Sequence, residues 1–178
     1  TLADTSADLL AAANASLPKP VLGAGDALTA FHGGRAMLRL GFERMGRDWT
    51  EADVDAGYPV LLEAYRAGIA THTRLYPGAM EAVEALRSAG IAVSICTNKP
   101  EGLAELLLAE LGVRAAFGAL VGADTFPVRK PDPTPYRAAV ERLEEEDLQI
   151  FARVAVHHGG ARHGAALRHA VEQQVRLV

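Results

Sequence analysis

Short apolar runs alternate with amphipathic stretches through the second half of the chain, and this alternation constrains the fold more than any other feature. Apolar runs at 91–96, 119–122, 154–156 and 175–178 have the length of buried strands. Helical stripes lie between them. Strands that alternate with helices predict an α/β fold, with a parallel sheet covered by helices on both faces. In such sheets ligands bind at the carboxyl ends of the strands.

The helices expected in this half have their own start and stop signals. Pro77-Gly78 precedes one amphipathic stretch that ends at Gly90. A second stretch ends at Gly112, and Pro135 stands at a plausible first helical position of a third. A fourth helix is expected at 165–174. The first of these helices precedes the first predicted strand and each of the others lies between two predicted strands, so the helix signals and the apolar runs predict the same alternation.

The first part of the chain, to about Thr73, shows helical patterns only. Its apolar stripes are Leu9-Leu10-Ala13, Met37-Leu38-Gly41-Met45 and Leu61-Leu62-Tyr65-Ile69. Thr50 and Asp53 have the spacing of an N-terminal capping box. This region is therefore predicted to be a small helical unit placed before the α/β part.

Two polar motifs directly follow predicted strands. Cys96-Thr97-Asn98-Lys99-Pro100 follows the run at 91–96, and Val128-Arg129-Lys130-Pro131-Asp132-Pro133 follows the run at 119–122. They bring a hydroxyl and an ammonium to one sheet edge, the pairing that a phosphoryl group needs. The alternatives are that Thr97-Asn98 only forms a turn and that Lys130 is an exposed loop lysine.

These motifs, together with Tyr76-Pro77-Gly78, resemble the haloacid dehalogenase superfamily, and within it the phosphoglycolate phosphatases. Thr1-Leu2-Ala3-Asp4-Thr5 resembles the end of the family's first motif, Asp-x-Asp-Gly-Thr-Leu-x-Asp-Thr. The resemblance implies a Rossmann-like core with an all-helical cap. Residues 1–8 would be the remnant of the first motif, 9–75 the cap and 76–178 the core.

The resemblance also implies a chemistry: magnesium-dependent hydrolysis of a small phosphate monoester, such as 2-phosphoglycolate, through an aspartyl-phosphate. Thr97 would bind the phosphoryl group, and Lys130 would steady the nucleophile and the phosphoryl charge. Asn98 and Lys99 would contact the substrate, and Arg35 in the cap is the candidate for its carboxylate. These roles are carried over from the family onto matching positions.

Two departures from the family pattern predict that the chain, as given, does not turn over substrate. Both catalytic aspartates of the first motif, and the central strand that carries them, would precede Thr1. The fourth motif should read Gly-Asp-Ser-x-x-Asp after Val156, but His158 and Arg162 stand where its acids belong. Because Mg²⁺ prefers oxygen ligands and a guanidinium repels it, no magnesium site is expected here.

A softer metal is a weak alternative. The nearby histidines are His157, His158, His163 and His169. Imidazole suits zinc, but the five-residue step from His158 to His163 does not align two ligands on one helix face. Two other functions stay open: a non-catalytic relative that binds a phosphorylated metabolite or a partner protein, and another small-substrate phosphatase or mutase of the superfamily.

Charge, cysteine count and hydrophobicity limit the partners and the cellular location that we expect. The net charge is −4 over 178 residues, which argues against a nucleic-acid partner. Cys96 is the single cysteine, so a reducing cytoplasmic environment is predicted. No apolar run approaches the ~20 residues of a membrane span, so no membrane partner is expected. The sequence gives no indication of the oligomeric state.

Overall fold

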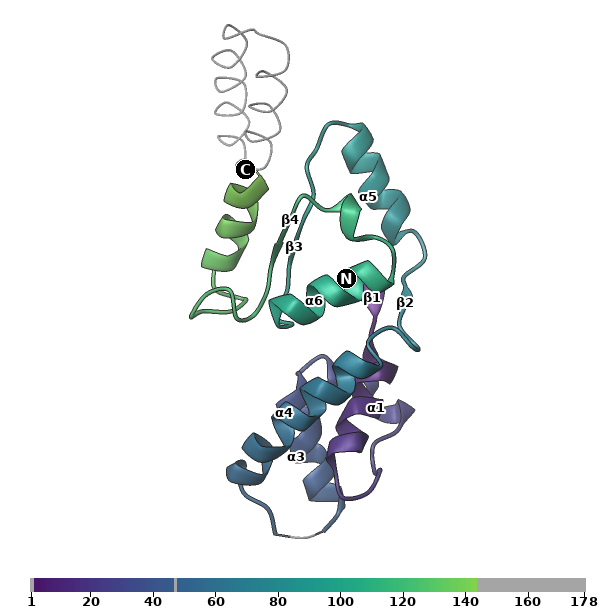
Figure 1. Ribbon diagram of the computed structural model, residues 1–178, viewed down its shortest axis with the longest axis vertical. Helices are drawn as coiled ribbons and strands as arrows, with labels where there is room; N and C mark the ends of the chain where they lie inside the picture. The colour runs from purple at the N-terminus through teal and green to yellow at the C-terminus, as the bar shows by residue number, and fades with distance from the viewer. Residues whose placement is uncertain (1, 47, 144–178) are drawn as a thin grey trace, which may run out of the picture.

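The computed structural model describes residues 2–46 and 48–143 (Figure 1). Within these ranges the chain forms a helical unit at one end and an α/β part at the other. The strands predicted at 154–156 and 175–178, the helix at 165–174, and the two substituted motif positions His158 and Arg162 lie outside the described residues. Those predictions stay predictions.

The helical unit, called the cap below, contains the helices α1 (Ser6–Ser16), α2 (Ala27–Ala30), α3 (Gly34–Arg44) and α4 (Glu51–Ala67), with a 3₁₀ turn at Ala24–Asp26. The capping box predicted at the start of α4 is confirmed: the Thr50 backbone N–H donates to Asp53 Oδ2 at 2.8 Å. This bond satisfies one of the backbone donors left open at the helix start.

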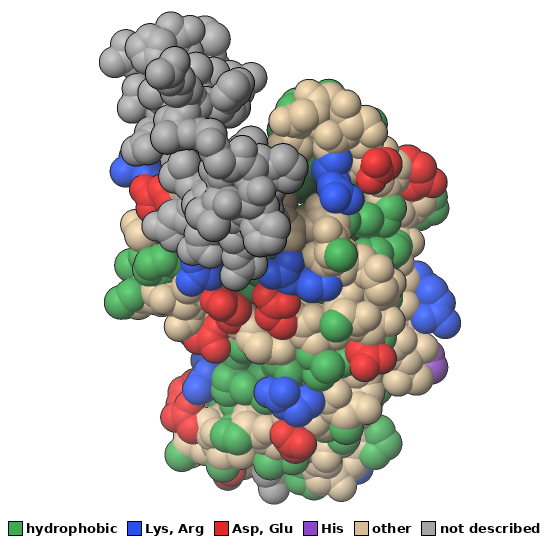
Figure 2. Space-filling view, turned by 45° about the horizontal axis from the view of Figure 1, so that its top comes forward, with side chains coloured by type: hydrophobic (Ala, Val, Ile, Leu, Met, Phe, Trp, Pro, Cys, Tyr) green, Lys and Arg blue, Asp and Glu red, His purple; other side chains and the backbone are tan. Residues whose placement is uncertain are grey.

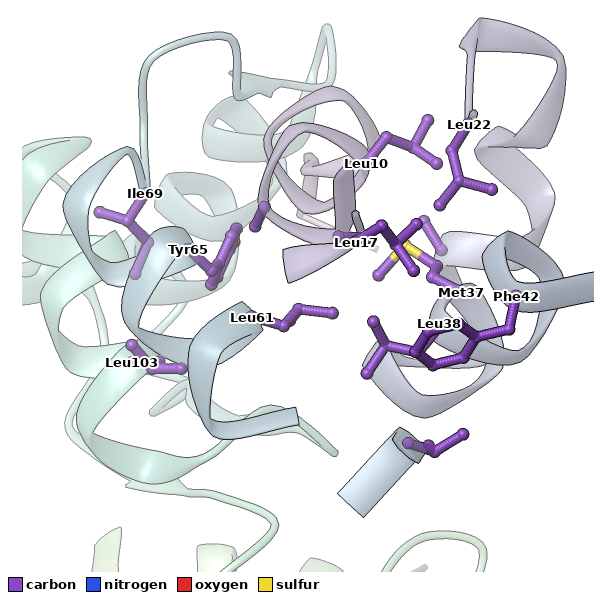
Figure 3. Close-up of a cluster of buried hydrophobic side chains, with 14 of the residues drawn as sticks. Leu10, Leu17, Leu22, Met37, Leu38, Phe42, Leu61, Tyr65, Ile69 and Leu103 are labelled. Atoms are coloured by element: carbon purple, nitrogen blue, oxygen red, sulfur yellow. The ribbon is translucent and has the colours of Figure 1, made fainter. Parts of the chain in front are cut away.

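The predicted apolar stripes of α1, α3 and α4 meet in one buried cluster (Figure 3). The largest fully buried side chains of the cap are Tyr65, Met37, Leu38, Leu61 and Val54. Leu103 of the α/β part joins the same cluster beside Tyr65 and Ile69. The cap and the α/β part therefore share apolar contacts.

Two short strands connect the cap to the rest of the molecule. β1 (Ala3–Asp4) pairs antiparallel with β2 (Arg74–Leu75). The expectation of helices only up to Thr73 missed β1, because a two-residue strand is too short to show the alternation that marks strands. Beside this pair, the buried Asp8 carboxylate accepts hydrogen bonds from His72 N at 2.9 Å and Thr73 Oγ1 at 2.7 Å. Asp8 thus fastens α1 to the segment that returns from the cap.

The α/β part confirms the predicted alternation. Its elements are α5 (Ala79–Ser88), β3 (Ser94–Cys96), α6 (Glu101–Glu110), a 3₁₀ turn (Arg114–Ala116) and β4 (Ala119–Val121), followed by a helical segment at 134–143. β3 and β4 are parallel, with Ile95 opposite Leu120. Gly90 and Gly112, with φ of 78° and 69°, follow α5 and α6 as predicted. The parallel sheet and helices are those of an α/β fold.

The strand predicted over 91–96 is shorter and less covered than expected. Strand geometry begins only at Ser94, and Ile91 is 52% exposed. β4, by contrast, is buried along its whole length, with Val121 at 0%. In the sheet of the described residues both strands have a partner on one edge only, and β4 is the more covered because Leu120 packs with Leu108, and Val121 with Ala138 and Ala139.

Candidate functional site

A cavity of about 350 Å³ lies between the cap and the loop that follows β3. Four of the predicted site residues line it: Thr97, Asn98, Lys99 and Arg35. From the cap, the wall also includes Gly33 and Gly34 at the start of α3, and Tyr58, Leu61 and Tyr65 of α4. The cavity therefore joins the carboxyl end of a sheet strand to the cap, where ligands of parallel sheets bind.

The loop after β3 is held in place by backbone bonds to the next strand. Thr97 N donates to Val121 O at 2.9 Å, and Ala123 N donates to Lys99 O at 2.9 Å. Thr97 Oγ1 accepts from Lys99 N at 3.1 Å. A hydroxyl group can donate one hydrogen bond through its proton and can accept others through its two lone pairs. The Thr97 hydroxyl is thus fixed by its loop and retains its proton for a ligand.

Asn98 joins the two polar motifs. Its Nδ2 donates to Lys130 O at 3.2 Å, and its Oδ1 accepts from Lys130 N at 3.1 Å. The Lys130 ammonium turns back to donate to Cys96 O, at the end of β3, at 2.8 Å. The motifs therefore meet at one sheet edge, and the Lys130 side chain is directed toward it rather than into solvent. Lys130 itself does not line the cavity described above and is joined to it through Asn98, which does.

Cys96 adds a thiol to this edge but not a reactive one. Its burial raises the pKa of the thiol, and the charge of Lys130 acts in the opposite direction with the smaller effect. A thiol with a raised pKa is largely protonated at neutral pH and is a poor nucleophile.

Lys99 crosses from the loop to the cap. Its Nζ donates to Tyr65 OH at 2.8 Å and lies 4.0 Å from the centroid of the Tyr65 ring. Burial lowers the pKa of Lys99 to about 8, while the negative charge of Asp8 acts in the opposite direction. Burial also raises the pKa of the Tyr65 phenol, so Tyr65 stays neutral where Lys99 titrates.

Arg35 lines the cavity from the cap side, but its guanidinium already has partners. It forms an ion pair with Asp55, on α4, and lies 4.7 Å from the centroid of the Tyr58 ring. The structure places Arg35 in the wall of the same cavity as Thr97 and Lys99. Its role toward a ligand stays a prediction.

Sequence reasoning missed three residues of this region. Tyr65 was assigned to the core stripe of its helix, and its ring is indeed 1% exposed, but its hydroxyl meets Lys99. Tyr58 and Asp8 were not singled out. Helical spacing identifies which face of a helix is buried, yet it cannot tell which polar atom on that face meets a loop from another part of the chain.

Residues 2–156 match the sequence model of the haloacid dehalogenase-like hydrolases. The match covers well over half of the chain. This chain belongs to that family. Its curated relatives include the phosphoglycolate phosphatase of Agrobacterium fabrum, 38% identical over 146 residues, which are 80% of this chain and 63% of the relative. The phosphoglycolate phosphatase of Mesorhizobium japonicum is 39% identical over 137 residues, 75% of this chain and 60% of the relative. The chain thus spans less than two thirds of the length of these relatives.

Solved structures agree on the fold. CbbY from Rhodobacter sphaeroides, solved in complex with phosphate, superposes with a TM-score of 0.62 at 22% identity and covers 81% of this chain and 68% of that one. A protein from Haemophilus somnus, described as a predicted phosphoglycolate phosphatase, gives a TM-score of 0.64 at 23% identity, with 78% and 65% covered. The Rossmann-like α/β fold of a haloacid dehalogenase-like hydrolase is therefore shown by both sequence and structure.

Magnesium is the ion that the family implies. Within 2–46 and 48–143, no three His, Cys, Asp or Glu side chains lie close enough together to hold a metal ion. The family resemblance places His158 and Arg162 at the two acids of the fourth motif, beyond the residues 2–156 that match the family model. An imidazole and a guanidinium are not the oxygen donors that Mg²⁺ prefers, so the poor fit of these residues to the ion stays a prediction.

In the part of the chain that the structure covers, no helix is both long and apolar enough to cross a membrane.

Proposed function

We propose that this haloacid dehalogenase-like hydrolase is of the phosphoglycolate phosphatase type and that its cavity binds a small phosphate monoester, 2-phosphoglycolate first among them. The observation that carries the proposal is the meeting of Thr97 and Lys130 at the carboxyl ends of β3 and β4, joined by Asn98. The two relatives named phosphoglycolate phosphatase, at 38% and 39% identity, support the choice of substrate.

The geometry supports binding of a phosphoryl group by hydrogen bonds and charge together. Thr97 Oγ1 accepts from Lys99 N, which leaves its proton for a phosphoryl oxygen. The Lys130 ammonium has three N–H groups, and one of them donates to Cys96 O. A shift of this ammonium toward the cavity would supply the charge-assisted hydrogen bonds that phosphate requires. The cap would then exclude water above the bound group.

The same proposal holds that the 178-residue chain binds without hydrolysing. The family's metal supplies charge neutralisation between an attacking carboxylate and the phosphoryl group. His158 and Arg162, which the resemblance places at the acids of the fourth motif, are not the oxygen donors that this metal prefers. The half-buried Cys96 thiol, whose pKa is raised, is a poor nucleophile.

A phosphate-release assay tests this directly. The purified chain is incubated with 2-phosphoglycolate and Mg²⁺, and the expected result is no release above the buffer rate. Binding is measured in the same samples by calorimetry, where a saturable signal is expected from the wild type and a much weaker one from Lys130→Ala. Phosphate release that disappears in Lys130→Ala would contradict the proposed inactivity.

A second candidate is a non-catalytic binding protein of the same family, favoured by the replacement of both motif-four acids by His158 and Arg162. The two candidates separate when the missing groups are restored. A chain extended with Asp-x-Asp-Gly ahead of Thr1 and carrying His158→Asp and Arg162→Asp should regain hydrolysis if it descends from a phosphatase. Retained binding without hydrolysis in that variant favours the binding protein.

The cysteine count and the distribution of surface charge support a cellular location and a class of ligand. The single cysteine supports a reducing, cytoplasmic location. On the face shown in Figure 2, Lys and Arg side chains are interspersed with Asp and Glu, and neither sign gathers into a broad patch. A small anionic metabolite that enters a local cationic cavity suits this surface better than a nucleic acid, which needs a basic face.

A further inference from the structure

We propose that Lys99, rather than Arg35, recognises a second anionic group of the ligand, such as the carboxylate of a small phosphorylated acid. The inference rests on the proposed function, because it assumes that the phosphoryl group occupies the edge formed by Thr97 and Lys130. It assigns the charge selectivity of the cavity to a side chain of the loop and not to the cap arginine.

Arg35 is the less suitable cation because its charge is already compensated. Its guanidinium pairs with the Asp55 carboxylate and lies over the Tyr58 ring. Both side chains of the pair are open to water, at 44% and 63% exposure. A ligand carboxylate would have to compete with Asp55 for the guanidinium, and water would screen what remains of the attraction.

The charge of Lys99 is less compensated and less exposed to water than that of Arg35. Its partner across the cavity is the neutral Tyr65 hydroxyl, at 2.8 Å. The carboxylate that acts on it electrostatically is that of Asp8, whose oxygens already accept from His72 N, Thr73 N and Thr73 Oγ1. Among the described residues, two of the three ammonium protons therefore have no acceptor. A half-buried cation with open donors attracts an anion more strongly than an exposed one does.

One ligand can contact Thr97 and Lys99 together. The Lys99 backbone N–H donates to Thr97 Oγ1 at 3.1 Å, and Lys99 Nζ donates to Tyr65 OH at 2.8 Å, so both side chains are held in place. Both line the same cavity of about 350 Å³. A ligand whose phosphoryl group meets Thr97 can place a carboxylate near Lys99 only if the two groups are close together.

The test compares three ligands on the full 178-residue chain by calorimetry at pH 7: 2-phosphoglycolate, ethyl phosphate and inorganic phosphate. We expect the wild type to bind 2-phosphoglycolate about tenfold more tightly than ethyl phosphate, the size of one charge-assisted hydrogen bond. Lys99→Met should remove this preference and leave ethyl phosphate binding unchanged. Lys99→Arg, which keeps the charge, should retain most of it.

Two matched variants complete the comparison. Arg35→Met removes the competing cation, and Lys19→Met removes an exposed lysine of the cap; both should keep the preference. The preference should also decline between pH 6.5 and 9.5 in the wild type, since the pKa of Lys99 is about 8, and stay flat in Lys99→Met. The titratable or charged groups that act on this ammonium are Tyr65 and Asp8, and those that line the same cavity are His32, Arg35, Tyr58 and Arg129.

A preference that persists in Lys99→Met and disappears in Arg35→Met, or in a variant of the exposed Arg129, would overturn the inference. So would equal wild-type affinities for 2-phosphoglycolate and ethyl phosphate, a result that leaves the proposed phosphate site intact. A wild-type chain that binds none of the three ligands refutes the proposed function, and the inference with it. Circular dichroism of each variant confirms that the fold is retained.

Discussion

The cap and the α/β part differ in the size of their buried apolar clusters. In the cap, Met37 and Leu38 are 0% exposed within one cluster that takes residues from α1, α2, α3 and α4 and is completed by Leu103 and Leu107 of α6. The other buried apolar residues of the α/β part form two smaller clusters. The cap therefore has the better packed core, while the chemically active loops extend from the less covered part.

This difference shows how the site obtains its rigidity. The loops after β3 and β4 are not held by a deep apolar core on both sides. They are held by hydrogen bonds between loops, through Asn98 and Lys130, and by contacts with the cap through Lys99 and Tyr65. The cap thus contributes to the order of the site as well as covering it.

The largest expected effect is on the free energy of unfolding, when a fully buried leucine of the cap is truncated. Leu38→Ala should lower the free energy of unfolding by about 2–5 kcal/mol, because it leaves a cavity in a fully buried position. Leu86→Ala, the matched change at a 42% exposed position of α5, should cost less than about 1 kcal/mol. Urea denaturation followed by circular dichroism measures both. Equal losses would contradict the contrast between the two parts.

The second effect concerns the connection between the parts. Asp8→Ala should lower the free energy of unfolding by about 3 kcal/mol, because it leaves the backbone donors of His72 and Thr73 without their acceptor in a buried place. Asp55→Ala removes an exposed carboxylate that pairs with Arg35 and should cost under about 1 kcal/mol. Thermal denaturation of the two variants provides the comparison, and a larger loss for Asp55→Ala would refute the role given to Asp8.

The third effect is a pH dependence at the contact between cap and loop. Burial lowers the pKa of Lys99 from 10.5 to about 8, so below pH 8 the lysine is charged in both the folded and the unfolded chain. Between pH 8 and 10.5 the unfolded chain binds the proton more strongly, and stability therefore rises with pH. We expect the wild type to gain on the order of 2 kcal/mol relative to Lys99→Met between pH 7 and 9.5. A constant difference over that range would show that Lys99 is not buried as described.

The smallest effect concerns the bridge between the two loops. Asn98→Ala removes two hydrogen bonds to the Lys130 backbone, and because the side chain is exposed the loss should be about 1 kcal/mol. Hydrogen exchange should nevertheless show faster exchange of the Lys130 amide. Unchanged exchange at Lys130 would mean that Asn98 does not hold the loop.

Much of this architecture could be predicted from the sequence because it depends on local signals. The stop signals at Gly90 and Gly112, the capping box at Thr50 and the apolar stripe of α4 all lie within one or two turns of the elements that they define. The meeting of the two polar motifs also followed, since the ends of parallel strands lie at the same edge.

The remainder depends on contacts between distant residues. The pairing of Arg35 with Asp55, twenty residues apart, and the bond from Lys99 to Tyr65 join separate elements. No periodicity within one element indicates such a partner. The short strand β1 was missed for a related reason, because its pairing with β2 is set by the return of the chain from the cap.

The central claim is that the loops after β3 and β4 form a phosphate-binding site below the cap. Titration of the ¹⁵N-labelled 178-residue chain with 2-phosphoglycolate, followed by amide chemical shifts, tests it most directly. We predict saturable shifts at Thr97, Asn98, Lys99 and Lys130, which weaken strongly in Lys130→Ala. Shifts that do not saturate, or saturable shifts confined to residues away from these loops, would contradict the claim.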